Sequence, residues 1–190
     1  MIVWIDTETT GVNYKKDVLL EVAVVITDDE LNVITGMSRL IDVKPRKLKN
    51  LNPFVQDMHE RSGLLKALEN ESSTVSLKNA EEDFIKFLKN NAVPERAVMA
   101  GNSIHFDRTF LDKFMPEFSK LFGHQNLDVT SIGHCVKRWH PAVYDLMKRK
   151  RGTVAHRALD DVLSSIDQLK AYRHYSFSAE PNLYLEASGH

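Results

Sequence analysis

Two acidic side chains near the start of the chain have a spacing that suits a divalent cation. Asp6 and Glu8 follow the apolar residues 2–5 and lead toward Gly11. If the first strand continues through them, alternate side chains share one face, so both carboxylates point the same way. Such a pair is repulsive, and Mg²⁺ or Mn²⁺, which prefer oxygen ligands, would remove that repulsion. The structural alternative is a polar strand end that runs into a turn at Gly11.

Two later stretches hold further candidates for the same chemistry. Asp107 lies where the chain is expected to leave a strand and begin a helix, a place where an aspartate can also act as an N-cap. His156 and Asp161 flank the start of a late helical segment. Residues five apart lie on different faces of one helix, so we expect His156 in the preceding loop and Asp161 in the first turns. Asp160 has the same acidic chemistry, and spacing alone does not choose between the two aspartates.

The elements that must position these residues follow from the apolar pattern. Strands rich in β-branched residues are expected over residues 2–6, 19–27 and about 31–43, with further short strands at 97–101 and 127–129. Helical periodicity covers residues 77–90, 107–115, 131–139 and 158–175. This order predicts an α/β protein with a mixed β-sheet flanked by α-helices. We expect one domain over residues 1–175 and an extended tail over residues 176–190.

Composition narrows the class of protein. The 190 residues are 43% hydrophobic and 27% charged, as in an ordinary globular domain, and no apolar run approaches the length that spans a bilayer. The first residues lack a secretory pattern, and a single cysteine, Cys135, cannot form an internal disulfide, so we expect a cytoplasmic protein. A net charge of −1 argues against holding long duplex DNA mainly by charge. A basic cluster at residues 148–151, just before His156, is a candidate phosphate contact.

The conjunction of these motifs is more specific than any one of them. Asp-x-Glu after the first strand, an aspartate opening a middle helix, and His-x₄-Asp opening a late helix resemble the DEDDh exonuclease family in residue type and order. The resemblance implies an RNase H-like fold and selects Asp161 over Asp160, because the family spacing is His-x₄-Asp. It also implies that four carboxylates hold two Mg²⁺ or Mn²⁺ ions beside a histidine general base; here these are Asp6, Glu8, Asp107, Asp161 and His156.

Within that family the chain is most similar to the oligoribonucleases, over roughly residues 1–175. The matching stretches are Gly101-Asn102-Ser103-Ile104, Asp107-Arg108, Met115-Pro116-Glu117, Leu127-Asp128-Val129 and Arg138-Trp139. The resemblance implies a homodimer that removes 5′-mononucleotides from the 3′ ends of short single-stranded oligoribonucleotides. The alternative is a DEDDh exonuclease acting on single-stranded DNA or on longer RNA 3′ ends.

Two readings from other classes fit the residues less well. A catalytically silent nucleic-acid-binding domain would be expected to lack a carboxylate or the histidine, and all five are present. A phosphatase with Asp6 as nucleophile would want a second aspartate where Glu8 stands.

The resemblance also implies substrate contacts. Val12 stands where the family has a leucine wedge, and Phe54 and His59 have the spacing of a base-stacking tryptophan and a histidine. Ser103 matches a serine that contacts the terminal phosphate, and Thr130 can add a hydroxyl. The structural alternatives are packing beside the turn for Val12, a core aromatic for Phe54 and a turn hydroxyl for Ser103.

Two departures from the oligoribonuclease pattern stand out. The usual Asp-Leu-Glu-Met-Thr-Gly is replaced by Asp-Thr-Glu-Thr-Thr-Gly at residues 6–11, which is the broader DEDDh form. A Tyr-Arg pair that the family uses across its dimer is replaced by His124 and Gln125. Because neutral glutamine cannot reproduce the forked phosphate contact of arginine, a strict preference for dinucleotides does not follow from this sequence.

Overall fold

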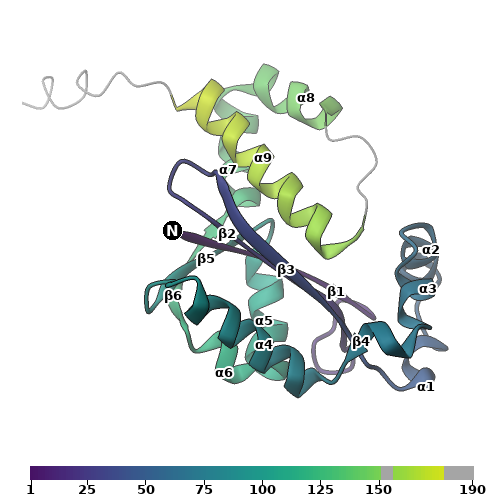
Figure 1. Cartoon of the computed structure of the whole chain (residues 1–190). Coiled ribbons are helices and arrows are strands. Elements are labelled where there is room, and N and C mark those ends of the chain that lie inside the picture. The colour runs from purple at the N-terminus through teal and green to yellow at the C-terminus, as the bar shows by residue number, and fades with distance from the viewer. Residues whose placement is uncertain (151–155, 178–190) are drawn as a thin grey trace, which may run out of the picture.

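The computed structural model describes residues 1–150 and 156–177, except the side chains of residues 71, 149 and 150 (Figure 1). The basic cluster at 148–151 and the tail at 176–190 therefore lie for the most part outside the described residues. Within the described part of the chain, six strands form one sheet in the order β4-β3-β2-β1-β5-β6. The bounds are β1 Ile2–Thr9, β2 Leu19–Thr27, β3 Val33–Ile41, β4 Thr74–Val75, β5 Ala97–Gly101 and β6 Phe122–Asp128.

The sheet is mixed, as the sequence predicts. The first three strands form an antiparallel meander, while β5 runs parallel to β1 and β6 runs parallel to β5. The first strand is longer than predicted, so both Asp6 and Glu8 lie on it. The strand predicted at residues 127–129 begins earlier, at Phe122, and is the sheet edge.

Helices cover both faces of the sheet (Figure 1). One layer comprises α4 Leu77–Asn90, α5 Ile104–Phe114 and α6 Pro116–Ser119, and the other comprises α7 Val129–Trp139, α8 Pro141–Lys150 and α9 Ala158–Ser176. Three short helices, α1 Pro45–Leu48, α2 Pro53–Arg61 and α3 Leu64–Leu68, lie beyond the end of the sheet where β1 stops (Figure 1). Among the described helices, none is long and apolar enough to cross a membrane.

The alternation of side chains along β1 decides which layer each residue meets. Val3 and Ile5 pack into the core under α4 to α6, whereas Trp4 packs into the core under α7 to α9. The same alternation carries on past the core. It directs Asp6 and Glu8 toward α9 and directs Thr7 toward α5.

Candidate active site

Three carboxylates meet where β1 ends and α9 begins. Asp6 and Glu8 come from β1 and Asp161 from the first turn of α9, and each offers an oxygen within 4.8 Å of the others'. We call these three residues the carboxylate cluster. The carboxylates at residues 6, 8 and 161, which the resemblance to the DEDDh family assigns to one site, are thus brought together in space.

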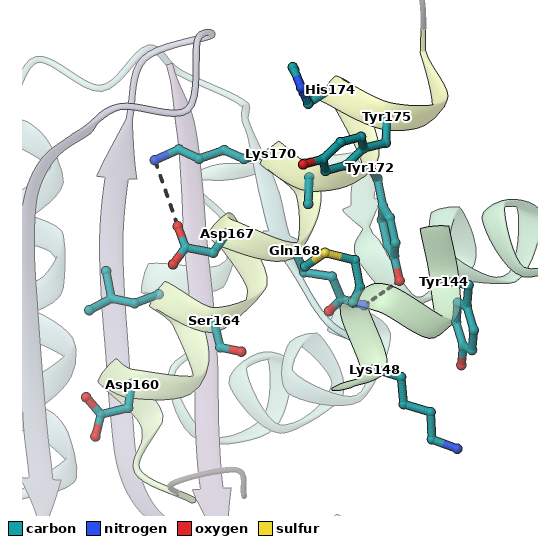
Figure 2. A pocket seen from close by; sticks show the side chains of 13 residues that line it. Tyr144, Lys148, Asp160, Ser164, Asp167, Gln168, Lys170, Tyr172, His174 and Tyr175 are labelled. Atoms are coloured by element: carbon teal, nitrogen blue, oxygen red, sulfur yellow. Dashed lines mark hydrogen bonds and ion pairs between the residues drawn. The ribbon is translucent and has the colours of Figure 1, made fainter. Parts of the chain in front are cut away.

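Asp160, which the spacing did not distinguish from Asp161, faces a different part of the molecule. A cavity of about 740 Å³ lies between α8 and α9, and Asp160 is one of its lining residues. Figure 2 shows Tyr144 and Lys148 of α8 on one side of this cavity and Tyr172 of α9 on the other. The carboxylate cluster does not line this cavity, so the cluster and the cavity between α8 and α9 are separate sites.

Asp107 approaches β1 from the opposite layer. It lies in the first turn of α5 with 4% of its surface exposed. Its Oδ1 accepts a hydrogen bond from the Thr7 backbone N–H at 2.9 Å and another from the Thr7 hydroxyl at 2.7 Å. Asp107 is outside the three-residue cluster, but it is near enough to raise the pKa of Asp6.

The acidic residues of β1 lie beyond the point where the parallel strands β1 and β5 stop pairing. Pairing of β1 with β5 ends at Trp4 and Ala100, one residue before Gly101. A Cβ on Gly101 would lie 2.7 Å from the carbonyl oxygen of Ile5. Only glycine therefore lets the end of β5 pass this close to the backbone of β1 at the point where pairing stops. Beyond this point Thr7 gives its backbone N–H to Asp107 instead of to a strand.

Burial and mutual repulsion dominate the electrostatics of the acidic residues. Burial, reinforced by the charge of Asp107, raises the pKa of Asp6 well above its usual value. Burial and the charge of Asp161 raise the pKa of Glu8 to about 8. Burial raises the pKa of Asp107 to about 7, although the hydrogen bonds from Thr7 act against this.

The donor set fits a hard divalent cation. It consists of carboxylate oxygens that repel one another in a buried place, and a bound cation would offset both the burial and the repulsion. Oxygen ligands of this kind suit Mg²⁺ and Mn²⁺ better than they suit Zn²⁺, whose sites usually include nitrogen or sulfur ligands.

His156 lies immediately before α9, as its spacing from Asp161 predicts. It is half-buried and has a left-handed backbone conformation, with φ of 50°. The next residue, Arg157, binds both carboxylate oxygens of Glu21 at 2.9 Å, and the Ala158 N–H donates to the same side chain at 3.2 Å. Glu21 lies on β2 directly opposite Glu8. The start of α9 is therefore fastened to the sheet beside the cluster, a contact that the sequence pattern did not reveal.

His59 of α2 is a buried neighbour of the cluster. Its Nε2–H donates to the carbonyl oxygen of Thr9 at 2.9 Å, and its Nδ1 lies 3.8 Å from Oε2 of Glu8. Burial lowers the pKa of this imidazole, so Nδ1 carries a lone pair, and it has no hydrogen-bond partner among the described residues. The His59 ring is 0% exposed, so it lies beside Glu8 on the side away from solvent.

The remaining predicted contact residues fall into two groups. Val12 and Phe54 are apolar side chains that are 82% and 74% exposed. Phe54 is thus a surface residue and not a core aromatic. Ser103 and Thr130 lie together, with hydroxyl oxygens 3.1 Å apart, and the carboxylate of Asp128 accepts the backbone N–H of both. His124 and Gln125 are exposed on the edge strand β6.

A mixed sheet with helices on both faces, and carboxylates that converge from its first strand and a late helix, defines an RNase H-like nuclease. Comparison with known proteins agrees. The pattern of the RNase_T exonuclease family matches residues 3–169, and the chain belongs to this family.

The most informative relatives are named oligoribonucleases. The chain is 37% identical over 177 residues to the mitochondrial oligoribonuclease of Homo sapiens. The aligned residues make up 93% of this chain and 73% of the human protein. It is 41% identical over 180 residues to the oligoribonuclease of Hydrogenovibrio crunogenus, with 94% and 95% covered.

A solved structure supports the fold. Exonuclease I from Methylocaldum szegediense superposes with a TM-score of 0.69 at 18% identity, over 93% of this chain and 41% of that one. At this identity the likeness speaks for the fold alone.

Proposed function

We propose that this chain is a 3′→5′ exoribonuclease that degrades short single-stranded oligoribonucleotides to 5′-mononucleotides. The observation that carries the proposal is the convergence of Asp6, Glu8 and Asp161 beside Asp107 in a chain of the exonuclease family. The relatives' shared name, oligoribonuclease, supports the choice of substrate.

The carboxylates would hold two divalent cations, Mg²⁺ or Mn²⁺. Asp6, Glu8 and Asp161 offer oxygens within reach of one another, and Asp107 approaches from the α5 side. Divalent cations, when bound, lower the pKa of water and stabilise the charge that develops on a phosphate and its leaving oxygen. The protein's part is to fix these oxygens close together, and because burial raises the pKa of Asp6, Glu8 and Asp107, the bound cations would be what keeps them ionised.

His156 would act as the general base. It lies in the loop that opens α9, five residues before Asp161, and is half-buried. An imidazole suits this role because its ordinary pKa is close to neutral pH. It would take the proton of the water that attacks the last phosphodiester, and cleavage would release a 5′-mononucleotide.

The exposed apolar residues would receive the bases. Phe54 and Val12 offer apolar surface to water, and aromatic stacking on a base contributes about 1–3 kcal/mol without sequence preference. Ser103 now donates its hydroxyl to Thr130, and Thr130 donates to Asn102; both hydroxyls would turn to donate to phosphate oxygens when substrate binds. His59, being buried behind Glu8, would act on that carboxylate and not by stacking on a base.

The proposal also covers the assembly of the chain and its location. The homodimer is proposed because the resemblance assigns the positions of His124 and Gln125 to a dimer contact, and both are exposed on an edge strand. A cytoplasmic location is proposed because one cysteine suits a reducing compartment.

One experiment tests the activity and separates it from its alternative. RNA and DNA oligomers of two to about twenty nucleotides, labelled at the 5′ end, are incubated with Mg²⁺, Mn²⁺ or chelator, and the products are resolved by length. Stepwise loss from the 3′ end of short RNA, dependent on the cation, is the expected result. Preference for DNA or for long RNA would instead support the alternative exonuclease, and no cleavage would reject both.

A further inference from the structure

Thr7 sits between two proposed metal ligands on β1, yet its side chain belongs to the other face of the sheet. Asp6 and Glu8 turn toward α9, and Thr7 turns toward α5, where it meets Asp107. Its side chain is buried, with 8% of the residue exposed. We propose that Thr7 is a positioning residue that fixes the carboxylate of Asp107 so that only its Oδ2 is presented to a cation; this inference rests on the proposed function.

The argument begins with the open edge of β1. Since β5 stops pairing with β1 at Trp4, the backbone N–H of Thr7 has no strand to receive it. A buried N–H without a partner is costly, and Oδ1 of Asp107 accepts it at 2.9 Å. This first bond is a backbone contact, so any residue other than proline at position 7 could make it.

The second bond depends on the side chain. The Thr7 hydroxyl donates to the same Oδ1 at 2.7 Å, a short distance typical of a bond to an ionised acceptor. A carboxylate oxygen has two lone pairs in its plane, and two donors occupy both of them. Both hydrogen bonds that Thr7 makes with the Asp107 side chain fall on Oδ1, so Oδ2 would be the oxygen left for a cation.

Fixing the carboxylate in this way favours metal binding. Two bonds to one oxygen restrict rotation of the group about its Cβ–Cγ bond, so less freedom is lost when a cation binds. Residues that orient a metal ligand typically change metal affinity by about 10- to 100-fold when they are replaced.

Thr7→Val is the decisive variant, because valine keeps the shape and the backbone N–H but lacks the hydroxyl. Thr7→Ser restores the hydroxyl. Thr27→Val is the matched control: Thr27 is also buried, and its Oγ1 accepts one buried hydrogen bond, from the Trp4 indole, at the far end of β1. Mn²⁺ binding to the full chain is measured by titration calorimetry, with the Mg²⁺ dependence of cleavage as a second readout.

We expect Thr7→Val to bind Mn²⁺ about tenfold more weakly, and to need correspondingly more Mg²⁺ for half-maximal cleavage. Thr7→Ser and Thr27→Val should bind as the wild type does, even if Thr27→Val melts at a lower temperature. Equal Mn²⁺ affinity in wild type and Thr7→Val would overturn the inference and leave the proposed function standing. Equal loss in Thr7→Val and Thr27→Val would also overturn it. A wild-type chain that binds no Mn²⁺ would overturn both proposals.

Discussion

Arg157 and Glu21 form a forked ion pair behind the carboxylate cluster. Nε and Nη2 of Arg157 each lie 2.9 Å from a different oxygen of Glu21, whose side chain is only 2% exposed. Glu21 is the cross-strand partner of Glu8, and Arg157 directly follows His156. The pair therefore neutralises an acidic group next to the cluster and fastens the start of α9 to β2.

Replacing this arginine should weaken both the fold and the reaction. Arg157→Ala leaves the carboxylate of Glu21 buried without its partner, and we expect the free energy of unfolding to fall by about 2–3 kcal/mol. This is below the range for fully buried pairs, because 32% of the Arg157 side chain is exposed. Turnover should fall because His156 and Asp161 lose their fixed support. Arg157→Lys keeps the charge but cannot make the forked contact, so its stability and turnover should lie between those of the wild type and Arg157→Ala. Denaturant unfolding and kcat measured below the melting temperature check both variants. An unchanged stability of Arg157→Ala would contradict the prediction.

The metal-free protein should become less stable as the pH rises. Its pKa values of about 8 for Glu8 and about 7 for Asp107 lie above the ordinary 4.5 and 3.8. The folded state thus holds protons that the unfolded state has already lost between pH 4 and 8, and stability declines through this window as the pH increases. Thermal melts from pH 5 to 8 in chelator should show the decline, and saturating Mg²⁺ should reduce it. A melting temperature that rises across the same range in chelator would refute this expectation.

Glu8→Gln should separate stability from activity. Removing this charge from a buried acidic site should raise the unfolding free energy of the metal-free protein at pH 8 by about 1–3 kcal/mol. The same change removes a proposed metal ligand, so cleavage should be nearly abolished. Melts and cleavage assays on one preparation give both values, and a variant that is destabilised at pH 8 would show that Glu8 is not under electrostatic strain.

The two neighbouring aspartates at the start of α9 should differ sharply. Asp161→Asn removes a member of the carboxylate cluster and should reduce kcat by at least about a hundredfold. Asp160 is not a member of the cluster and lines the cavity between α8 and α9, so Asp160→Asn should keep near-normal turnover. Cleavage rates at saturating Mg²⁺ test the pair, and comparable losses in the two variants would be inconsistent with the assignment.

His156→Ala should lose turnover while retaining metal. A positioned general base contributes about 10²–10⁴-fold to rate, and kcat should fall accordingly. Since the carboxylates are unchanged, Mn²⁺ affinity by calorimetry should stay within about twofold of wild type. Loss of Mn²⁺ binding would instead assign His156 to the metal site.

Phe54 should govern affinity for short substrates. Phe54→Ala removes an exposed ring and should raise KM by about 5- to 100-fold with little change in kcat, as expected for the loss of one stacked base. Phe54→Trp enlarges the stacking face and should lower KM. Dinucleotide kinetics measure both, and an unchanged KM in Phe54→Ala would remove Phe54 from the substrate path.

Elements with strong local patterns could be predicted from the sequence. The helix at residues 77–90 has the predicted bounds, because its apolar residues recur at helical spacing and Ser76 caps it. The three early strands predicted from their β-branched residues were confirmed as β1, β2 and β3. Helices α2, α3 and α8 are among those that were not predicted; they run for only 9, 5 and 10 residues, so each offers few turns over which an apolar period could be recognised.

The carboxylates of the acidic site could be predicted from the sequence, but the contacts that hold them in place could not. Alternation along β1 predicted that Asp6 and Glu8 share one face, and the resemblance to the DEDDh family selected Asp161; the structure brings these three carboxylates together. The contacts of Thr7 with Asp107, of Arg157 with Glu21 and of His59 with Thr9 join residues 50 to 136 positions apart. Such pairs leave no periodic signal in one sequence, so only the folded chain reveals them.

The carboxylate cluster joins the first strand of the sheet to the last described helix. A ribosome makes β1 early and α9 late, so Asp161 is the last acidic member to emerge. In the proposed mechanism, a partly synthesised chain therefore cannot cut RNA, because its set of ligands is incomplete. Cations that bridge β1 and α9 would then clasp the two ends of the domain together and favour the completed fold over any fragment.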